Sequence, residues 1–506
     1  MVGLVATSVM CASMAAVAFV LCFYLYVKMV YRYFEKRGIP YDNPTFPFGS
    51  FASLAQLRKP YHDILVDMYN KYKSHKMVGF FSLWKKEILI TDPEILKSIL
   101  IRDFNVFHDR GVYSNKLEDP LSANLFALHG DVWRSTRNKV TPTFSSGKIK
   151  GMLSIIVQCA NQVVRYVDML NDQIVEFQPL FSRYGLAVIS NGAFSLDCDV
   201  LKTRDSMFVK MAGETFAPTL ERLVSTFIRF NNNGFAKHLK MRIMPQSVCD
   251  FFMDMFTNAV KHREVTGEIR SDYLQLLIQL RQSGLKAQNN EVEFTEMELV
   301  TEAFVFILAG SETTSRAMSF CLYELAQNPE IQEKVRAEVD SLTEMNYETL
   351  NKLEYLEMVI DETLRKYPPL PFLNRECNSD YKVPETGFTI EKGTQVLVST
   401  RGLHNDPDLY PEPEKFIPER FSKENRMNIK PCTYMPFGEG QRACIGQRFA
   451  KVVMKVGIST FLRNYEIHST PVTPYPVQFE PKNMLTTELG SCRLRVEKRG
   501  QFRFFS

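Results

Sequence analysis

Several features that mark common functional classes are missing from this 506-residue chain. Its 61 Lys and Arg residues nearly balance its 57 Asp and Glu residues, and the net charge is only +4, so no basic excess indicates a nucleic-acid-binding protein. The chain has no internal repeat and no low-complexity tract. Because 45% of its residues are hydrophobic, one large core is possible, although the length alone suggests about three domains.

The ten cysteines include no pair at C-x-x-C spacing, which argues against a zinc ribbon or thioredoxin-like chemistry. Cysteines scattered in this way are typical of a reduced, cytosol-facing chain whose thiols fill the core. The candidate exception is Cys444, which lies between glycines in "FGEGQRACIGQRFA", residues 437–450. It has no nearby cysteine with which to form a disulfide or a multi-cysteine metal site.

Residues 1–27, "MVGLVATSVMCASMAAVAFVLCFYLYV", form an apolar run without any charge. Its length matches the ~20 apolar residues needed to cross ~30 Å of hydrocarbon. A cleaved signal peptide is the alternative, but no basic segment precedes the run, and it continues past Ala18. We therefore expect an uncleaved, single-pass transmembrane anchor. By the positive-inside rule the main body lies in the cytosol, because basic residues follow at Lys28, Arg32, Lys36 and Arg37.

A basic, Pro-rich neck is expected over residues 28–50, where three prolines favour an extended and fairly stiff chain. Residues 51–506 then form one domain, expected to be mainly α with small β-sheets. Apolar residues alternate around a polar turn at 76–93, which predicts a hairpin. Residues 145–375 have helical periodicity almost throughout. Further strands are predicted within 381–400, 492–499 and 501–506.

The longest predicted helix has a capping box at Thr295 and Glu298 and ends before Pro329, which makes it about 48 Å long at 1.5 Å per residue. Its centre, "AGSETTS", contains glycine and hydroxyl side chains that weaken or bend a helix. A local rule broken inside a buried helix suggests a functional site. The alternative is that Gly310 admits a close contact with another helix.

Cys444 is predicted at the start of a second helix, where free N–H groups and the helix dipole would stabilise a thiolate. Gly446 would let something flat and bulky approach the backbone, and Phe437 could cover the sulfur. Arg442 could pair with an anionic group beside it. A single thiolate, a planar neighbour and an arginine for a carboxylate together indicate haem held by cysteine.

The segment "GEGQRA" also fits the dinucleotide-binding pattern, with a helix afterwards and Glu466 about 20 residues further on. That pattern requires a strand that leads directly into the first glycine. Here Pro431 and Pro436 make the preceding segment a poor parallel strand. The position near the end of the chain also leaves no room for a doubly wound sheet, so this alternative is disfavoured.

Taken together, the motifs resemble those of the cytochrome P450 family of haem-thiolate monooxygenases. "FGEGQRACIG" matches the F-x-x-G-x-R-x-C-x-G signature, which is highly specific, and "AGSETTS" is similar to the oxygen-activating helix. "ETLR", "FIPERF" and "WRSTR" resemble the E-x-x-R, P-E-R-F and W-x-x-x-R motifs in the family's order. The likeness covers nearly the whole chain after the anchor. It is greatest to animal microsomal enzymes that oxidise foreign compounds, especially insect detoxification enzymes, as in "DPLSANLF" and "TPTFSSGKIKGM".

The resemblance implies a P450 fold that binds haem b, with Cys444 as the axial ligand of the iron. It implies that the haem propionates meet Trp133, Arg137, Arg375, Arg110 and Arg442. It also implies a structural network of Glu362, Arg365 and Arg420. Thr313 would hold water beside bound oxygen and Glu312 would connect it to solvent as the acid, with Thr314 as an alternative hydroxyl. The implied substrate pocket is lined by Phe126, Val305, Leu308, Ala309, Leu370, Leu373 and Leu485.

No nicotinamide or flavin domain is visible, so the resemblance implies electrons from NADPH through NADPH-cytochrome P450 reductase, with cytochrome b5 as a further candidate. Contacts with the reductase are expected at Arg134, Lys139, Arg448 and Lys451. The implied location is the endoplasmic reticulum membrane, and residues 206–256 form either an access lid on the lipid surface or ordinary packed helices. Expected substrates are lipophilic xenobiotics such as insecticides and plant toxins, or endogenous lipids and hormones. A haem-thiolate isomerase or dehydratase, or a haem-binding sensor or carrier, is the alternative.

Overall fold

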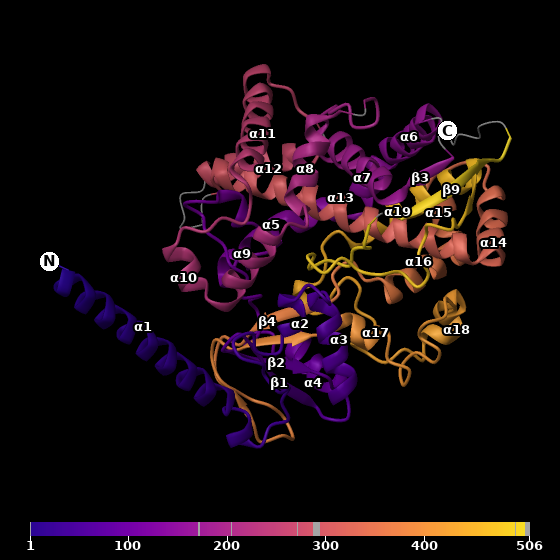
Figure 1. Ribbon diagram of the computed structural model, residues 1–506. Helices are drawn as coiled ribbons and strands as arrows, with labels where there is room; N and C mark the ends of the chain where they lie inside the picture. Colours follow the sequence, from indigo (N-terminus) through magenta and orange to yellow (C-terminus); the bar gives the residue numbers. More distant parts are fainter. Residues whose placement is uncertain are drawn as a thin grey trace.

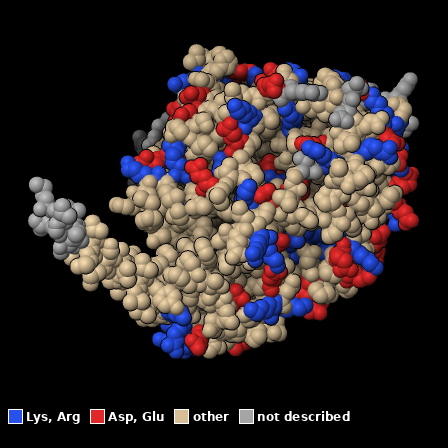
Figure 2. Space-filling model, viewed as in Figure 1, with Lys and Arg blue, Asp and Glu red and all other residues tan. Residues whose placement is uncertain are grey.

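The computed structural model describes residues 2–170, 173–203, 205–270, 272–286, 294–490 and 492–500. As Figure 1 shows, one long helix projects from a body that is mostly helical, with β-strands gathered in two places. The prediction of a mainly α protein with small sheets is confirmed. Charges of both signs are spread over the face seen in Figure 2, whereas the projecting helix is uncharged down to its base.

The projecting helix α1 (Val2–Tyr31) is exposed over residues 9–22, and the segment Val9–Arg37 is long and apolar enough to cross a membrane. Its base is docked on the body. Val27 is fully buried, and the Tyr31 hydroxyl donates to the Leu83 carbonyl at 3.0 Å. The helix therefore runs four residues into the predicted neck, because its last turn has apolar side chains that the body can bury.

The larger sheet has the strand order β1-β2-β7-β4. Strands β1 (Met77–Ser82) and β2 (Lys85–Ile90) form the predicted hairpin, β7 (Gln395–Val398) pairs in parallel with β2, and β4 (Leu373–Glu376) pairs antiparallel with β7. A two-stranded ribbon joins β5 (Tyr381–Lys382) to β6 (Thr389–Ile390). Strand β4 carries Arg375 and Leu373 into the interior.

The smaller sheet, in the order β3-β9-β8, lies near the C-terminal end of the described chain. It consists of β3 (Ile174–Glu176), β9 (Arg493–Lys498) and β8 (Tyr465–His468). The strand predicted within 492–499 is confirmed by β9. The strand predicted at 501–506 lies outside the described residues.

Helix α13 (Glu296–Gln327) crosses the body and carries the predicted capping box at Thr295. It packs along α7 (Phe177–Phe194), where a Cβ at Gly310 would lie only 2.8 Å from Ile189. Opposite, a Cβ at Gly185 would lie 2.9 Å from the Cα of Ser311. Gly310 therefore allows a close contact between α13 and α7, as the alternative prediction for this segment stated. The helix is continuous through Gly310.

The remaining helices cover the two hydrophobic cores, one around α13 and one around the larger sheet. They are α2 (Ala52–Ala55), α3 (Tyr61–Tyr72), α4 (Pro93–Lys97), α5 (Gly130–Val140), α6 (Ser146–Leu170), α8 (Met207–Phe216), α9 (Leu220–Asn231), α10 (Asn233–His238), α11 (Gln246–Thr266), α12 (Tyr273–Lys286), α14 (Pro329–Asp340), α15 (Tyr347–Asn351), α16 (Glu354–Lys366), α17 (Thr400–His404), α18 (Lys423–Arg426) and α19 (Gln447–Asn464).

Candidate functional site

The loop before α19 is shaped by glycines. Gly440 has a φ of 71°, and a Cβ there would lie 2.0 Å from the Leu100 carbonyl oxygen, so only glycine fits. The Cys444 N–H donates to the Phe437 carbonyl at 2.8 Å and closes the loop. Helix α19 begins at Gln447, so the predicted helix start at Cys444 was wrong by three residues. A 3-10 turn at Gly440–Arg442 and an extended Ala443 delay the helix.

One backbone N–H and two positive charges nevertheless act on the Cys444 sulfur. Burial raises the pKa of the Cys444 thiol, whereas the Gly446 N–H, which donates to the sulfur, and the charges of Arg137 and Arg110 lower it. The side chain is exposed by surface area even though burial dominates its pKa. A group that is both accessible and desolvated lies against an internal space rather than on the outer surface.

Four arginine side chains border the same space. Arg137 donates to the Ala443 carbonyl at 2.9 Å and Arg110 to the Arg442 carbonyl at 3.0 Å. Burial is the main cause that lowers the pKa of Arg442 to about 9 and that of Arg375 to about 10. The charges of the other three arginines lower the pKa of Arg110 further, after burial. Four cations in mutual reach, with Arg375 and Arg442 buried and the other two half-buried, need anions nearby.

Asp109 supplies one such anion, at 3.4 Å from Arg442. Burial would raise its pKa, but hydrogen bonds from His129 and the Gly130 N–H and the nearby charge of His108 bring that pKa down to about 2. One carboxylate does not balance four guanidinium groups. The pocket therefore carries a net positive charge that further anions could neutralise.

Two arginine atoms indicate where those anions would bind. Arg442 Nη1 and Arg375 Nε are buried and have no hydrogen-bond partner among the described residues. The Arg442 guanidinium lies over the Trp133 ring, with its central carbon 3.8 Å from the ring centre, and this contact helps to hold it in place. A planar group with two carboxylates, such as haem b, fits this set of donors and the thiol of Cys444.

Helix α13 presents a stripe of accessible residues inside the body. Val305 and Thr313 are half-buried and Ala309 is exposed in mid-helix, although Leu308 and Thr314 beside them are buried. Residues four apart lie on one helix face. The accessible hydroxyl in this stripe is therefore that of Thr313, which donates to the Ala309 carbonyl at 2.6 Å, and not that of Thr314.

Glu312 points in a different direction. Its carboxylate is buried, accepts from Gln178 Nε2 at 3.2 Å and forms an ion pair with Arg316, one turn further along α13. Glu312 and Thr313 are neighbours in the chain, but the structure does not bring their side chains into contact.

The predicted structural network is assembled in full below the loop. Arg365 donates to both carboxylate oxygens of Glu362, at 2.7 and 2.9 Å, and Arg420 approaches the same carboxylate at 3.4 Å. The Glu362 and Arg365 side chains are completely buried. Arg365 also donates to the carbonyls of His404 and Pro413, both at 2.8 Å.

The other predicted pocket residues lie at the edge of this region. Phe126 is partly exposed and stacks with the Arg110 guanidinium at 4.2 Å. Leu373 lies against the loop, 3.9 Å from a Cβ at Gly438. Leu370 and Leu485 are half-buried. Leu308 differs from these residues because it is buried in the main core.

Sequence reasoning missed His404 and Arg316, which support the loop and Glu312 respectively. His404 Nε2 accepts from the Met435 N–H at 2.8 Å, two residues before Phe437. A lone histidine gives no signal in one sequence. The spacing of Arg316 four residues after Glu312 is a signal for a helical ion pair, and it could have been used.

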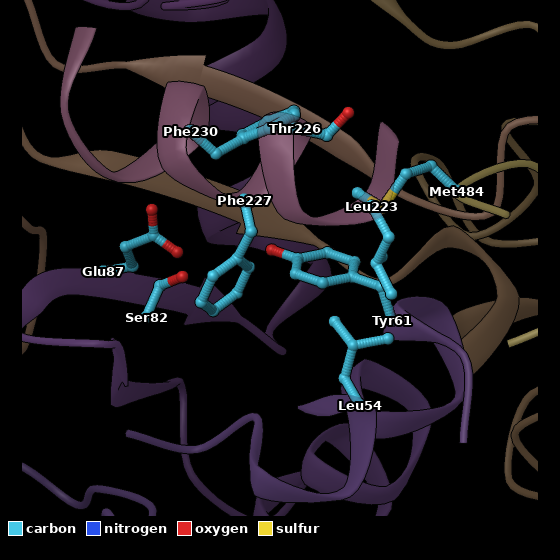
Figure 3. A pocket seen from close by; sticks show the side chains of 9 residues that line it. All are labelled: Leu54, Tyr61, Ser82, Glu87, Leu223, Thr226, Phe227, Phe230 and Met484. Carbon is cyan, nitrogen blue, oxygen red and sulfur yellow. The ribbon is translucent and has the colours of Figure 1, made fainter. Parts of the chain in front are cut away.

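A separate small pocket lies between the larger sheet and α9 (Figure 3). Its walls are mostly apolar, with the buried Glu87 carboxylate and the Tyr61 hydroxyl as polar features. The full lining is Leu54, Tyr61, Ser82, Glu87, Leu223, Thr226, Phe227, Phe230 and Met484. Its lining includes none of the residues predicted to line the substrate pocket, although Met484 precedes Leu485 in the chain.

The basic residues that are predicted to contact the reductase differ in their exposure and in their ion pairs. Arg134 and Arg448 are exposed, with weak contacts to Asp131 and Ser146. Lys451 is mostly buried and paired with two carboxylates, at 2.8 Å from one of them, so its charge is already neutralised. Lys139 is half-buried.

Comparison with known proteins agrees with this geometry. The family model described as cytochrome P450 matches residues 40–492. The chain is 36% identical to "Probable cytochrome P450 6a14" and to "Cytochrome P450 6a2" of Drosophila melanogaster, each over 94% of this chain and 97% of the relative. It is 34% identical to "Cytochrome P450 6d3" of Musca domestica, over 94% of this chain and 96% of the relative.

Proposed function

The chain belongs to the cytochrome P450 family of haem monooxygenases, and we propose that it inserts one oxygen atom into lipophilic small molecules with electrons from NADPH-cytochrome P450 reductase. The observation that carries the proposal is the accessible thiol of Cys444 inside the body, bordered by four arginines, two of which are buried and have an unpaired donor atom. These residues suit a thiolate-bound haem and its two propionates.

Cys444 would hold the iron, and Arg110, Arg137, Arg375 and Arg442 would hold the propionates, with Trp133 supporting Arg442. When bound, haem supplies the oxygen and redox chemistry, which a thiolate ligand favours. Phe437 and Gly446 shape the surroundings of the sulfur.

Thr313 and Glu312 would supply protons. The Thr313 hydroxyl can hold a water on the accessible face of α13, and Glu312 can deliver a proton to that water once its side chain turns. We expect Thr313→Ala to keep haem and to lower the yield of product per oxygen consumed. Without the hydroxyl, no group on this face of α13 holds the water that delivers the proton. An unchanged yield would contradict the role of Thr313.

The proposed location is the endoplasmic reticulum membrane, with the body in the cytosol and α1 as the anchor. Exposed apolar residues on α9 and α10 support contact of the segment 206–256 with lipid; they are Leu220, Val224 and Phe235. Of the four basic residues predicted to contact the reductase, the exposed Arg134 and Arg448 are the ones proposed here. Cytochrome b5 is a further candidate partner.

The proposed substrates are lipophilic xenobiotics, including insecticides and plant toxins, or endogenous lipids and hormones. Apolar residues at the predicted pocket, among them Phe126, Val305 and Leu373, support a substrate with little charge. The likeness to insect relatives that bear P450 6 names supports the same class of function.

The carbon monoxide difference spectrum of the reduced protein tests the proposal. A strongly red-shifted haem band in wild type that is lost in Cys444→Ser would establish the thiolate. Cys377→Ser is the matched control, because Cys377 is buried elsewhere and its Sγ donates to Ser379, a bond that serine can replace. NADPH-dependent, substrate-dependent oxygen uptake with reductase then tests the monooxygenase activity. Turnover without reductase would indicate an isomerase or dehydratase instead.

A further inference from the structure

Two buried carboxyl groups share one arginine beside Thr313. Arg316 is only 3% exposed, and its Nη2 atom pairs with Glu312. Its Nη1 atom donates to the Thr487 hydroxyl at 2.5 Å. The next residue along the chain, Glu488, is 5% exposed, and both the Arg316 and the Glu312 charge act on it.

Glu488 lies on a hairpin that reaches the surface. A β-bridge joins Phe479 to Glu488, and the Glu480 N–H donates to the Thr487 carbonyl at 2.9 Å. Leu489, the following residue, is 45% exposed. Glu488 therefore stands between the solvent-facing edge of the hairpin and the interior ion pair.

One hydrogen-bond donor and one hydrogen-bond acceptor of this cluster lack a partner. Arg316 Nε is a buried donor and Glu488 Oε2 is a buried acceptor, and neither has a hydrogen-bond partner within the described chain. Native proteins pair nearly all such atoms, so a donor and an acceptor left over in one cluster indicate a second arrangement or a bridging water.

The charges also do not balance. Two ionised carboxylates and one guanidinium would leave a net negative charge in the interior, which is costly. Burial raises the pKa of Glu488 and the negative charge of Glu312 adds to this, whereas hydrogen bonds from the Glu488 and Cys492 N–H groups and the charge of Arg316 lower it; the net direction is upward. The thiol of Cys492, whose own pKa burial raises to a very high value, adds no charge near neutral pH. The cluster is neutral when it holds one proton, and since Arg316 pairs with Glu312 and Glu488 Oε2 is unpaired, Glu488 is the carboxyl suited to hold it.

We propose that Arg316 is a switch between Glu312 and Glu488, and that Glu488 is the proton store from which Glu312 is reloaded. The proposal rests on the proton-delivery role of Glu312 proposed above. In the arrangement seen here Arg316 pairs with ionised Glu312, and Glu488 is protonated. In the second arrangement Arg316 pairs with ionised Glu488, and Glu312 carries the proton.

The exchange conserves protons and charge. The O–H bond of Glu488 breaks and an O–H bond of Glu312 forms, through the cluster or a bridging water. Neutral Glu312 is then released from Arg316 and can turn towards the water held by Thr313, to which it gives the proton. Glu488 is reprotonated from solvent at the hairpin edge beside Leu489. Arg316 and Glu488 are thus positioning residues, because neither touches the reacting atoms.

The resting state of the switch is tested by infrared spectroscopy on the haem-containing protein near neutral pH. We expect protonated-carboxyl absorbance that loses the contribution of one group in Glu488→Gln and is unchanged in Glu480→Gln. Glu480 is the matched control, since it lies on the same hairpin but outside the cluster and accepts from the Lys482 N–H. Glu302, whose buried carboxyl has a pKa raised to about 8, contributes to this absorbance equally in both variants. No difference between the two variants would overturn the proposal.

Turnover tests the role of the switch. With reductase and NADPH, Glu488→Gln is expected to lower the product formed per oxygen by about tenfold, below the full effect of a general acid because solvent can partly replace the store. Hydrogen peroxide brings its own protons, so peroxide-driven turnover of the same variant should equal that of Glu480→Gln. An equal loss in both assays would mean a structural role and would refute the switch. If Thr313→Ala lowers the yield and Glu488→Gln does not, the proposed function stands and this inference fails.

Discussion

Acid should loosen the loop that carries Cys444, because a buried neutral histidine holds it. His404 is fully buried; its Nε2 accepts from the Met435 N–H at 2.8 Å, and its Nδ1 lies 3.2 Å from the Arg365 carbonyl. These contacts require the neutral ring with its proton on Nδ1. Burial, and then the charge of Arg365, lower the pKa of His404 to about 3.

The sign and size of the effect follow from proton linkage. Between about pH 6.5, the ordinary pKa of histidine, and about pH 3, the unfolded chain binds a proton at His404 and the folded protein does not. The free energy of unfolding therefore falls as the pH is lowered through this range, by ~1.4 kcal/mol per pH unit. From about pH 7.5 to about pH 5 the expected loss is ~2 kcal/mol.

His404→Gln isolates this contribution, because an amide oxygen can accept from the Met435 N–H without titrating. Urea unfolding of the haem-containing protein, followed by the loss of the thiolate haem band, gives the free energy at both pH values. Other groups, such as the buried His62, contribute equally to wild type and variant. The wild type should lose ~2 kcal/mol more than the variant. If wild type and variant lost the same free energy of unfolding, His404 would not be a buried neutral histidine that stabilises the loop.

Two further predictions follow from close contacts and unpaired donors. Gly185→Ala should lower the stability by about 1–3 kcal/mol in thermal unfolding, since its Cβ would lie 2.9 Å from an α13 backbone atom, whereas Gly192→Ala, with 3.9 Å to its nearest neighbour, should be nearly neutral. Arg375→Gln should speed the transfer of haem to an acceptor protein by at least about tenfold, because a buried charge partner costs about 2–5 kcal/mol to remove. The exposed Arg134→Gln should leave that rate unchanged, and an equal rate in both variants would contradict the propionate contact.

Local patterns in the sequence predicted those parts of the fold that depend on neighbouring residues. The hairpin at β1 and β2 follows from period-two alternation, and the start of α13 follows from the Thr295–Glu298 capping box. The prediction of Cys444 as a special thiol also needed only its local setting. In contrast, the start of α19 was misplaced, because the 3-10 turn before it depends on the approach of Leu100 from a distant segment.

Residue roles that depend on distant partners could not be predicted from spacing alone. The sequence places Glu312 beside Thr313, but the direction of its carboxylate is set by Gln178 on α7 and by Arg316. The centre of α13 was interpreted as a weak point of the helix. Its Gly310 instead accommodates Ile189 of α7, a contact between residues more than a hundred positions apart.

The buried networks around Glu362 and around Arg316 differ in whether their hydrogen-bonding atoms are all paired, which fits the different roles proposed for them. Around Glu362 one carboxylate accepts from Arg365, from Arg420 and from the Ile417 N–H at 2.9 Å, and no buried side-chain atom of these three charged residues lacks a hydrogen-bond partner. A satisfied network of this kind has one low-energy arrangement and is suited to hold the Cys444 loop still. Around Arg316 the carboxyl groups outnumber the cation, and one donor and one acceptor stay unpaired. Such a network has unused hydrogen-bonding groups for the second arrangement proposed above, and a change of partner is the property that a proton-delivering site requires.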